Sequence, residues 1–298
     1  MRQIGMVLAL LAVFAVAARA AQASQLIDRD ATHISLESNA KGEAMLTYTA
    51  DGKVKHVLAW GAENAIAPTP GRKQVAFKLD YSGGYGKYHR TSYWASFNGS
   101  CVPYDGPTLA WSVMACKSAS DGSYWALQSW QRALPNYGTS PTPEQRAWEL
   151  RLSHWTGNLP VLSLTADWSY RKYEQIFGTY TYDGTGIYGF KSTSSGVPLD
   201  SFGRNIYVDT FSSAYGAGWH RENSFLTHKL KGSFCYGFFP HGSHPAGNSV
   251  RYRATAEGPG VTPDVMWQGT SPGHYNRTAD ATANSDIKEL GDPKCKPN

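Results

Sequence analysis

Leu162-Ser-Leu-Thr-Ala-Asp-Trp-Ser-Tyr170 carries the clearest structural pattern in this chain. Apolar or aromatic residues occupy every second position, and polar residues lie between them. Successive side chains of a β-strand point to opposite faces of a sheet, so this alternation predicts a half-buried strand. An amphipathic helix would instead repeat its apolar residues every three or four positions.

Period-two alternation recurs on both sides of this stretch, in residues 75–81, 148–152 and 250–255. Asp51-Gly52 and Asp183-Gly184 lie between such runs. The Asp-Gly pair readily adopts the positive φ angles of a two-residue hairpin turn. We therefore expect many short strands, several of them joined by tight hairpins.

Helical signals are few. Thr142-Pro143-Glu144-Gln145 combines a capping side chain, a proline suited to the first helical turn and a glutamine three residues after the cap, so one short helix is expected there. We predict an all-β fold: an antiparallel β-sandwich or open barrel with at most one or two short helices. No linker is evident, which predicts a single β-rich domain over residues 24–270. Residues 271–298 are polar and are expected to form a surface tail.

The first 23 residues have the pattern of a secretory signal peptide. Arg2 precedes an apolar run from Ile4 to Ala18, and Ala21-Gln22-Ala23 offers small residues at a cleavage site. The apolar run is shorter than the roughly 20 residues that cross a bilayer. We predict cleavage before Ser24 and a soluble product, secreted or periplasmic, without a membrane span.

Four cysteines follow the leader, and export would place them in an oxidising compartment, where disulfides form. Four cysteines allow three pairings. The preferred one joins Cys101 to Cys116 around a short loop and Cys235 to Cys295, which would tether the tail. The alternative is a free, buried Cys235 and a disordered tail.

Charge and motifs exclude several classes of protein. Of 28 basic and 23 acidic residues only Arg2 and Arg19 lie in the leader, which leaves 26 basic residues and a net charge of +3 in the mature chain. The basic residues are scattered singly, so nucleic acid is not expected as a partner. Signature motifs of serine hydrolases, zinc peptidases and phosphate-binding loops are missing, and we predict no metal or cofactor. The glycine-rich Gly83-Gly-Tyr-Gly-Lys87 is expected to be a flexible turn.

Candidate catalytic residues come from histidines and acids, because imidazole and carboxylate groups together can transfer protons or bind a metal. His220 and Glu222 would share one side of a strand, and they are the residues that we would assign to catalysis in a hydrolase. Glu149 is a further acid that no turn explains. The other histidines of the C-terminal third are His228, His241 and His244.

Aromatic residues make up 13% of the chain, with ten Trp and eighteen Tyr. Tyr124, Trp125 and Trp130 lie in one aromatic stretch that places rings on both faces of an expected strand. Exposed rings on a rigid sheet can stack against sugar rings, so these three are candidate binding residues. Packing in the core is the alternative for each Trp.

Four segments resemble a family of bacterial exported proteins. They are Tyr104-Asp-Gly-Pro-Thr-Leu-Ala-Trp111, Asp121-Gly-Ser-Tyr-Trp-Ala-Leu-Gln-Ser-Trp-Gln-Arg132, Glu222-Asn-Ser-Phe-Leu-Thr-His228 and Gly258-Pro-Gly-Val-Thr-Pro-Asp-Val-Met-Trp-Gln268. The likeness covers most of the mature chain. That family carries no assigned activity, so the resemblance implies a bacterial secreted protein and supplies no catalytic residues.

Three functions remain open. Export, near-neutral charge, aromatic richness and a β fold favour an extracellular protein that binds glycan, polysaccharide or cell-wall material. A secreted hydrolase with a carboxylate and His site at Glu222 and His220 is the second hypothesis. A structural or partner-binding envelope protein is the third.

Overall fold

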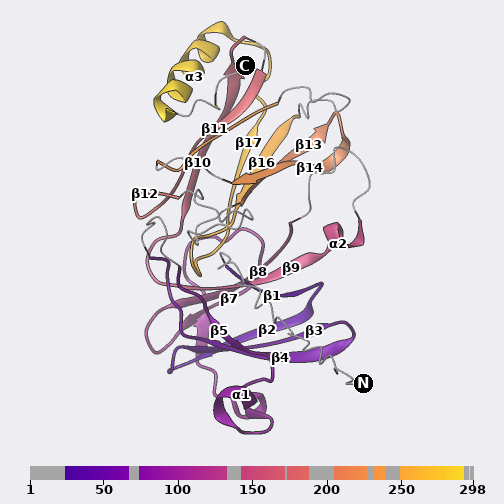
Figure 1. Ribbon diagram of the computed structural model, residues 1–298, viewed down its shortest axis with the longest axis vertical. Coiled ribbons are helices and arrows are strands. Elements are labelled where there is room, and N and C mark those ends of the chain that lie inside the picture. Colours follow the sequence, from indigo (N-terminus) through magenta and orange to yellow (C-terminus); the bar gives the residue numbers. More distant parts are fainter. Residues whose placement is uncertain are drawn as a thin grey trace, which may run out of the picture.

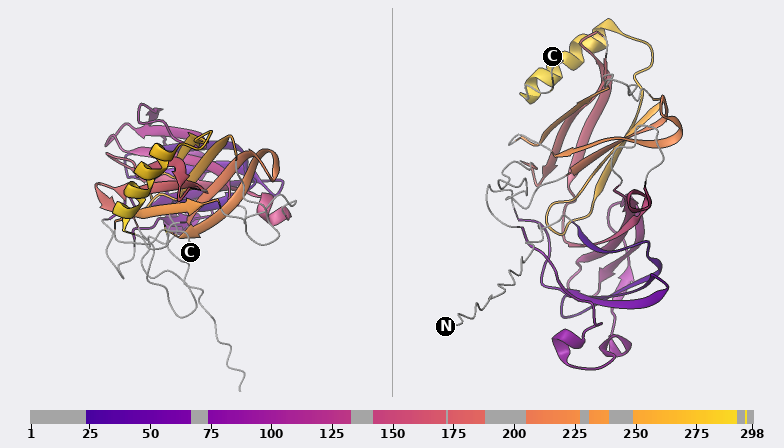
Figure 2. Two further views of the ribbon diagram at one scale, coloured as in Figure 1. Left: turned by 90° about the horizontal axis from the view of Figure 1, so that it is seen from above. Right: turned by 45° about the vertical axis from the view of Figure 1, so that its right-hand side comes forward.

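The computed structural model describes residues 24–66, 74–132, 142–171, 173–187, 205–226, 231–238, 249–291 and 295. These residues form four antiparallel sheets, arranged as two halves that lie end to end along the long axis of the molecule (Figure 1). The rotated views show the same arrangement (Figure 2). The predicted all-β class is therefore confirmed.

The N-terminal half is a sandwich of a five-stranded sheet, in the order β1-β9-β8-β7-β6, and a four-stranded sheet, in the order β2-β3-β4-β5. Leu46 and Val57 from one sheet and Trp125, Leu127 and Leu152 from the other are fully buried in one core between them. The strands are β1 (Gln25–Arg29), β2 (Thr32–Asn39), β3 (Glu43–Ala50), β4 (Lys53–Trp60), β5 (Lys78–Asp80), β6 (Cys101–Pro103), β7 (Ser112–Ser118), β8 (Tyr124–Gln131) and β9 (Trp148–Trp155).

The C-terminal half is a second sandwich. In one sheet β11 pairs with β10 along one edge and with β12 and β15 along the other; the second sheet has the order β14-β13-β16-β17. Ile176, Tyr180, Val208 and Tyr252 belong to the core between these sheets. The strands are β10 (Val161–Ser169), β11 (Tyr173–Tyr182), β12 (Thr185–Gly186), β13 (Asn205–Ser213), β14 (Gly216–Leu226), β15 (Ser233–Gly237), β16 (Arg251–Ala256) and β17 (Val265–Thr270).

Both predicted hairpin turns are confirmed. Asp51 and Gly52 connect β3 to β4 as a two-residue loop, and Asp183 and Gly184 connect β11 to β12 in the same way. All four residues have positive φ angles, as the mirror-image turns of hairpins require. The strand predicted at 75–81 is shorter than expected, because only residues 78–80 of this run, strand β5, pair with another strand.

The helices are α1 (Tyr85–Tyr88), α2 (Pro143–Arg146) and α3 (Arg277–Leu290), with a 3₁₀ turn at Tyr93–Ser96. The predicted α2 is confirmed, with reciprocal capping bonds between Thr142 and Gln145. Helix α3 lies in the C-terminal segment for which the polar composition predicted a surface tail. Its narrow apolar stripe includes Ala283 and Ile287, which pack on Phe177 and Cys295. In the part of the chain that the structure describes, no helix is long and apolar enough to cross a membrane.

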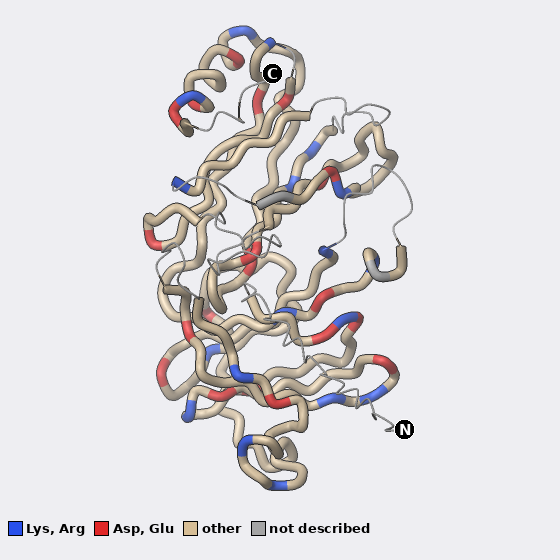
Figure 3. The backbone as a smooth tube through the Cα atoms, viewed as in Figure 1, with Lys and Arg blue, Asp and Glu red and all other residues tan. Residues whose placement is uncertain are grey.

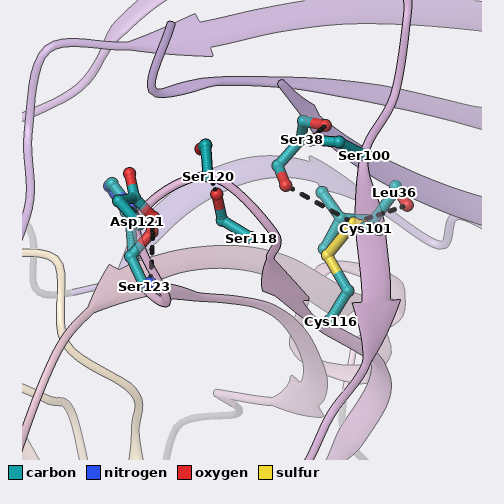
Figure 4. The surroundings of a disulfide bond; sticks show 10 residues. Leu36, Ser38, Ser100, Cys101, Cys116, Ser118, Ser120, Asp121 and Ser123 are labelled. Carbon is teal, nitrogen blue, oxygen red and sulfur yellow. Dashed lines mark hydrogen bonds between the residues drawn. A yellow bond between two sulfur atoms is a disulfide. The ribbon is translucent and has the colours of Figure 1, made fainter. Parts of the chain in front are cut away.

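Two disulfides have the predicted pairing. Cys101 on β6 is bonded to Cys116 on β7, beside Ser38 of the facing sheet (Figure 4). Cys235 on β15 is bonded to Cys295, which lies beyond α3 and fastens the chain end to the second sandwich. Two disulfides are typical of proteins that function in an oxidising compartment.

A loop between β16 and β17 joins the two halves (Figure 1). Val261 from this loop is part of the N-terminal core, and its carbonyl accepts a hydrogen bond from the His154 amide at 2.9 Å. Gln128 on β8 makes two bonds to the backbone of Asp264, at 2.8 and 2.9 Å. The halves are thus connected through hydrogen bonds to the backbone of the β16–β17 loop.

Candidate functional site

The aromatic residues predicted to bind sugar are mostly in the core. Trp125 is fully buried and stacks on His154 with ring centroids 3.7 Å apart. Trp130 is also buried and donates its indole N–H to Asp264 Oδ2 at 2.7 Å. The prediction is wrong for both, because the β2–β5 sheet covers one face of β8 and the β16–β17 loop covers the other. Tyr124 is half-buried, and its hydroxyl donates to Asp105.

The two proposed catalytic residues have separate surroundings. Glu222 is fully buried in the C-terminal half and accepts hydrogen bonds from Tyr236 at 3.0 Å and Tyr215 at 3.4 Å. A register shift makes it an extra residue in β14 opposite β13. His220 is partly exposed, and its ring nitrogen contacts the Ala217 carbonyl at 3.0 Å.

Three of the histidines, His228, His241 and His244, lie outside the described residues. Within the described ranges, no group of three or more His, Cys, Asp or Glu could hold a metal ion. Glu149 is buried where the two halves meet and forms ion pairs with Arg132 and Arg151. Its carboxylate therefore has a place in the packing of the molecule.

Among the described residues, an open cleft on the N-terminal sandwich is the best candidate for a binding site. It has a volume of about 570 Å³, within the range of small-ligand sites. We call it the aromatic cleft. It is lined by residues of β1, β4 and the segment that follows β5, namely Ile27, Asp28, Val54, Lys55, His56, Tyr81, Ser82 and Trp94.

Two aromatic side chains of the aromatic cleft are exposed. Tyr81 is 51% exposed and Trp94 is 41% exposed. The Trp94 indole stacks on His56 with a centroid distance of 3.8 Å and an interplanar angle of 5°. One face of the indole is therefore covered by His56. The Tyr81 hydroxyl donates to the Ile27 carbonyl at 3.1 Å, which fixes the ring in position.

Two polar residues of the cleft, Asp28 and Lys55, belong to an ion-paired cluster. Lys55 Nζ donates to Asp28 at 2.8 Å and to Asp51 at 2.9 Å. Asp28 also accepts from the Tyr48 hydroxyl at 3.0 Å and from the Arg29 amide at 2.9 Å. Burial alone would raise the pKa of Asp28, but these hydrogen bonds hold this pKa below its usual range. An ammonium group has three donors and a carboxylate has about four acceptor sites. Lys55 and Asp28 can therefore each form a further hydrogen bond, for example to a ligand.

The loop that carries Tyr81 and Trp94 is shaped by two glycines. Gly83 and Gly84 both have positive φ angles and are buried. A Cβ on Gly83 would lie 3.0 Å from both His56 and Trp94, and a Cβ on Gly84 would lie 2.4 Å from the Tyr93 ring. The close approach of the backbone to these rings therefore requires glycine. The sequence predicted a flexible turn at Gly83-Gly-Tyr-Gly-Lys87. In the structure this segment forms the packed turn and most of helix α1.

Two carboxylates hold the same loop against the sheet. Asp80 at the end of β5 accepts bonds from the amides of Ser82 and Lys87, at 2.9 and 3.1 Å. Fully buried Glu43 on β3 accepts from Lys87 Nζ at 2.5 Å and from the Tyr88 hydroxyl. Burial alone would raise the pKa of each, but these hydrogen bonds hold both pKa values below the usual range. The aromatic cleft is therefore preorganised.

Sequence reasoning missed this site. Its lining residues come from three separate segments of the chain, and the sequence of each segment alone is only a weak sign of a binding site. Trp94 lies in Thr91-Ser-Tyr-Trp-Ala-Ser96, where polar neighbours are a sign of exposure.

Comparison of the chain with family models, with curated proteins and with solved structures gave no match.

Proposed function

We propose that this protein is exported and binds a neutral glycan in the aromatic cleft. The observation that carries the proposal is the pair of exposed rings, Tyr81 and Trp94, beside hydrogen-bonding groups on a rigid sheet. Sugar rings present apolar C–H faces and hydroxyl edges, which suit such a combination. Rings that are already held by His56 and the Ile27 carbonyl lose little freedom on binding.

The charges around the cleft favour a neutral ligand over an acidic one. Lys55 is its basic lining residue, and it is already paired with both Asp28 and Asp51. The carboxylate of Asp28 lines the cleft, where it can accept from a sugar hydroxyl but would repel a carboxylate or sulfate. Neutral polysaccharides of cell walls are thus the class of ligand that we favour.

Export is the second part of this proposal. The leader pattern at residues 1–23 and the two disulfides support a secreted or periplasmic protein. The resemblance to bacterial exported proteins agrees with this location.

A glycan array of neutral and acidic polysaccharides, probed with the mature protein, tests the proposal. We expect binding to a neutral glycan, and a loss of about tenfold or more in affinity for Trp94→Ala, which corresponds to about 1.4 kcal/mol. Trp148→Ala is the matched control, because Trp148 is 45% exposed on β9 and does not line the cleft. Absence of glycan binding, or equal losses in the two variants, would contradict the proposal.

A further inference from the structure

Ser24, the residue after the predicted cleavage site, is fully buried where the two halves meet. Its hydroxyl donates to Asp264 Oδ1 at 2.6 Å and accepts from Arg151 Nε at 2.8 Å. Its carbonyl accepts from Arg151 Nη2 at 2.8 Å. A serine at the start of a mature chain is normally exposed and mobile, so these contacts call for an explanation.

Ser24 is part of a cluster of buried charges, which we call the junction network. Arg151 is fully buried and lies 2.9 Å from Glu149, 3.8 Å from Glu257 and 3.5 Å from Asp264. Arg132 joins Glu149 to Glu257, at 3.1 and 2.7 Å. Acidic and basic residues meet at this level of the molecule, between the two halves (Figure 3). The network thus connects the residue before β1, the residue after β8, strand β9 and the β16–β17 loop.

In the part of the chain that the structure describes, the buried portion of this network has more acids than bases. Among the described residues it contains three carboxylates, of Glu149, Glu257 and Asp264, and two guanidinium groups, of Arg132 and Arg151. Arg29 also contacts Glu149, but its side chain is 57% exposed and lies at the rim. Each of the three carboxylates lies within 4 Å of a guanidinium group, but two guanidinium groups leave one negative charge over, and a buried net charge is costly. A further cation near Asp264 would balance the buried cluster.

We propose that the α-ammonium group of Ser24, created by proteolytic removal of residues 1–23, is that cation. Hydrolysis adds water across the Ala23–Ser24 peptide bond, releases Ala23 as a carboxylate and leaves the Ser24 nitrogen as an amine. An α-amine takes up a proton at neutral pH, because its ordinary pKa is about 8. The Ser24 nitrogen is joined to the same Cα as the hydroxymethyl group that touches Asp264, so covalent geometry keeps it within about 6 Å of this carboxylate.

This inference makes the junction network a receptor for the processed N-terminus. Ser24 is buried where the two halves meet, so the proposal requires cleavage before the halves pack around it. The new charge then stabilises the closed arrangement, because Asp264 belongs to the β16–β17 loop and Arg151 to β9. Removal of the leader would thereby be coupled to assembly of the two sandwiches.

Chemical labelling of the α-amine tests the proposal. The protein is purified after export, and intact mass gives its first residue, which we expect to be Ser24. Reductive methylation at about pH 6.5, where lysine amines are almost fully protonated, is then followed in the native protein and in urea. We expect labelling of Ser24 to be at least about tenfold slower in the native state. A different first residue, or equal labelling rates, would overturn the proposal.

A second measurement identifies the partner of the ammonium group. One glycine added before Ser24 moves the charge away from Asp264, and we expect the melting temperature to fall by about 4 °C or more. The same glycine added after Asn298 is the matched control and is expected to leave it unchanged. In an Asp264→Asn background the N-terminal glycine should have less than half of this effect. An unchanged melting temperature, or an equal loss in that background, would refute the pairing with Asp264.

Discussion

Gly84→Ala tests whether the backbone of the aromatic cleft is built around its rings. Gly84 has a φ of +100°, and a Cβ there would lie 2.4 Å from Tyr93 Cδ1. The positive φ alone disfavours alanine by about 1–2 kcal/mol. Overpacking adds about 1–3 kcal/mol, because Tyr93 is buried and stacks on Tyr88 with centroids 4.3 Å apart. We therefore expect a total loss of about 2–5 kcal/mol in the free energy of unfolding.

Gly52→Ala separates the two contributions. Gly52 has a φ of +70° in the β3–β4 hairpin, and a Cβ there would have no atom within 4 Å. Its variant carries the backbone strain without the steric conflict, so urea unfolding should give a smaller loss for Gly52→Ala by about 1–3 kcal/mol. Glycan affinity should fall in Gly84→Ala alone, since Trp94 follows Tyr93 in the chain. Equal losses of stability in the two variants would refute this reasoning.

Two further predictions concern acid stability and the disulfides. The pKa of Asp28 in the folded protein is below its usual 3.8, so its contribution to stability is complete above that pH and is lost as the pH falls through the lower value. Urea unfolding should show that wild type loses more stability than Asp28→Asn between about pH 5 and pH 2, and parallel curves would contradict the assignment. Replacing Cys235 and Cys295 by serine should cost about 4 kcal/mol of stability, and replacing Cys101 and Cys116 should cost about 3 kcal/mol. The first loss is larger because the chain-entropy effect of a disulfide grows with the sequence separation of its cysteines, which is 60 residues for the first pair and 15 for the second. Calorimetry of the two double variants measures this order, and the reverse order would show that chain entropy does not dominate.

Local sequence signals predicted the strands and turns well. The alternation at 162–170 corresponds to β10, which pairs along its whole length with β11. Asp51-Gly52 and Asp183-Gly184 have the turn geometry that their residue types favour. These features depend on neighbours in the chain, which is why periodicity and turn chemistry were sufficient.

Features that depend on distant segments could not be predicted in this way. The alternation in 124–130 could not show that the β16–β17 loop, more than a hundred residues later, covers one face of β8 and so buries Trp130. Helix α3 was missed because most of its residues are polar, and its stability comes from the contact of Ala283 and Ile287 with β11. The aromatic cleft likewise exists only where β1, β4 and the loop after β5 meet.

Hydrogen exchange of the protein with and without its bound glycan tests the central claim most directly, because it locates the ligand without any substitution. We expect added protection in peptides covering residues 53–57 and 80–97, and little change in the C-terminal sandwich. Protection confined to other strands, or none on binding, would contradict a glycan site in the aromatic cleft.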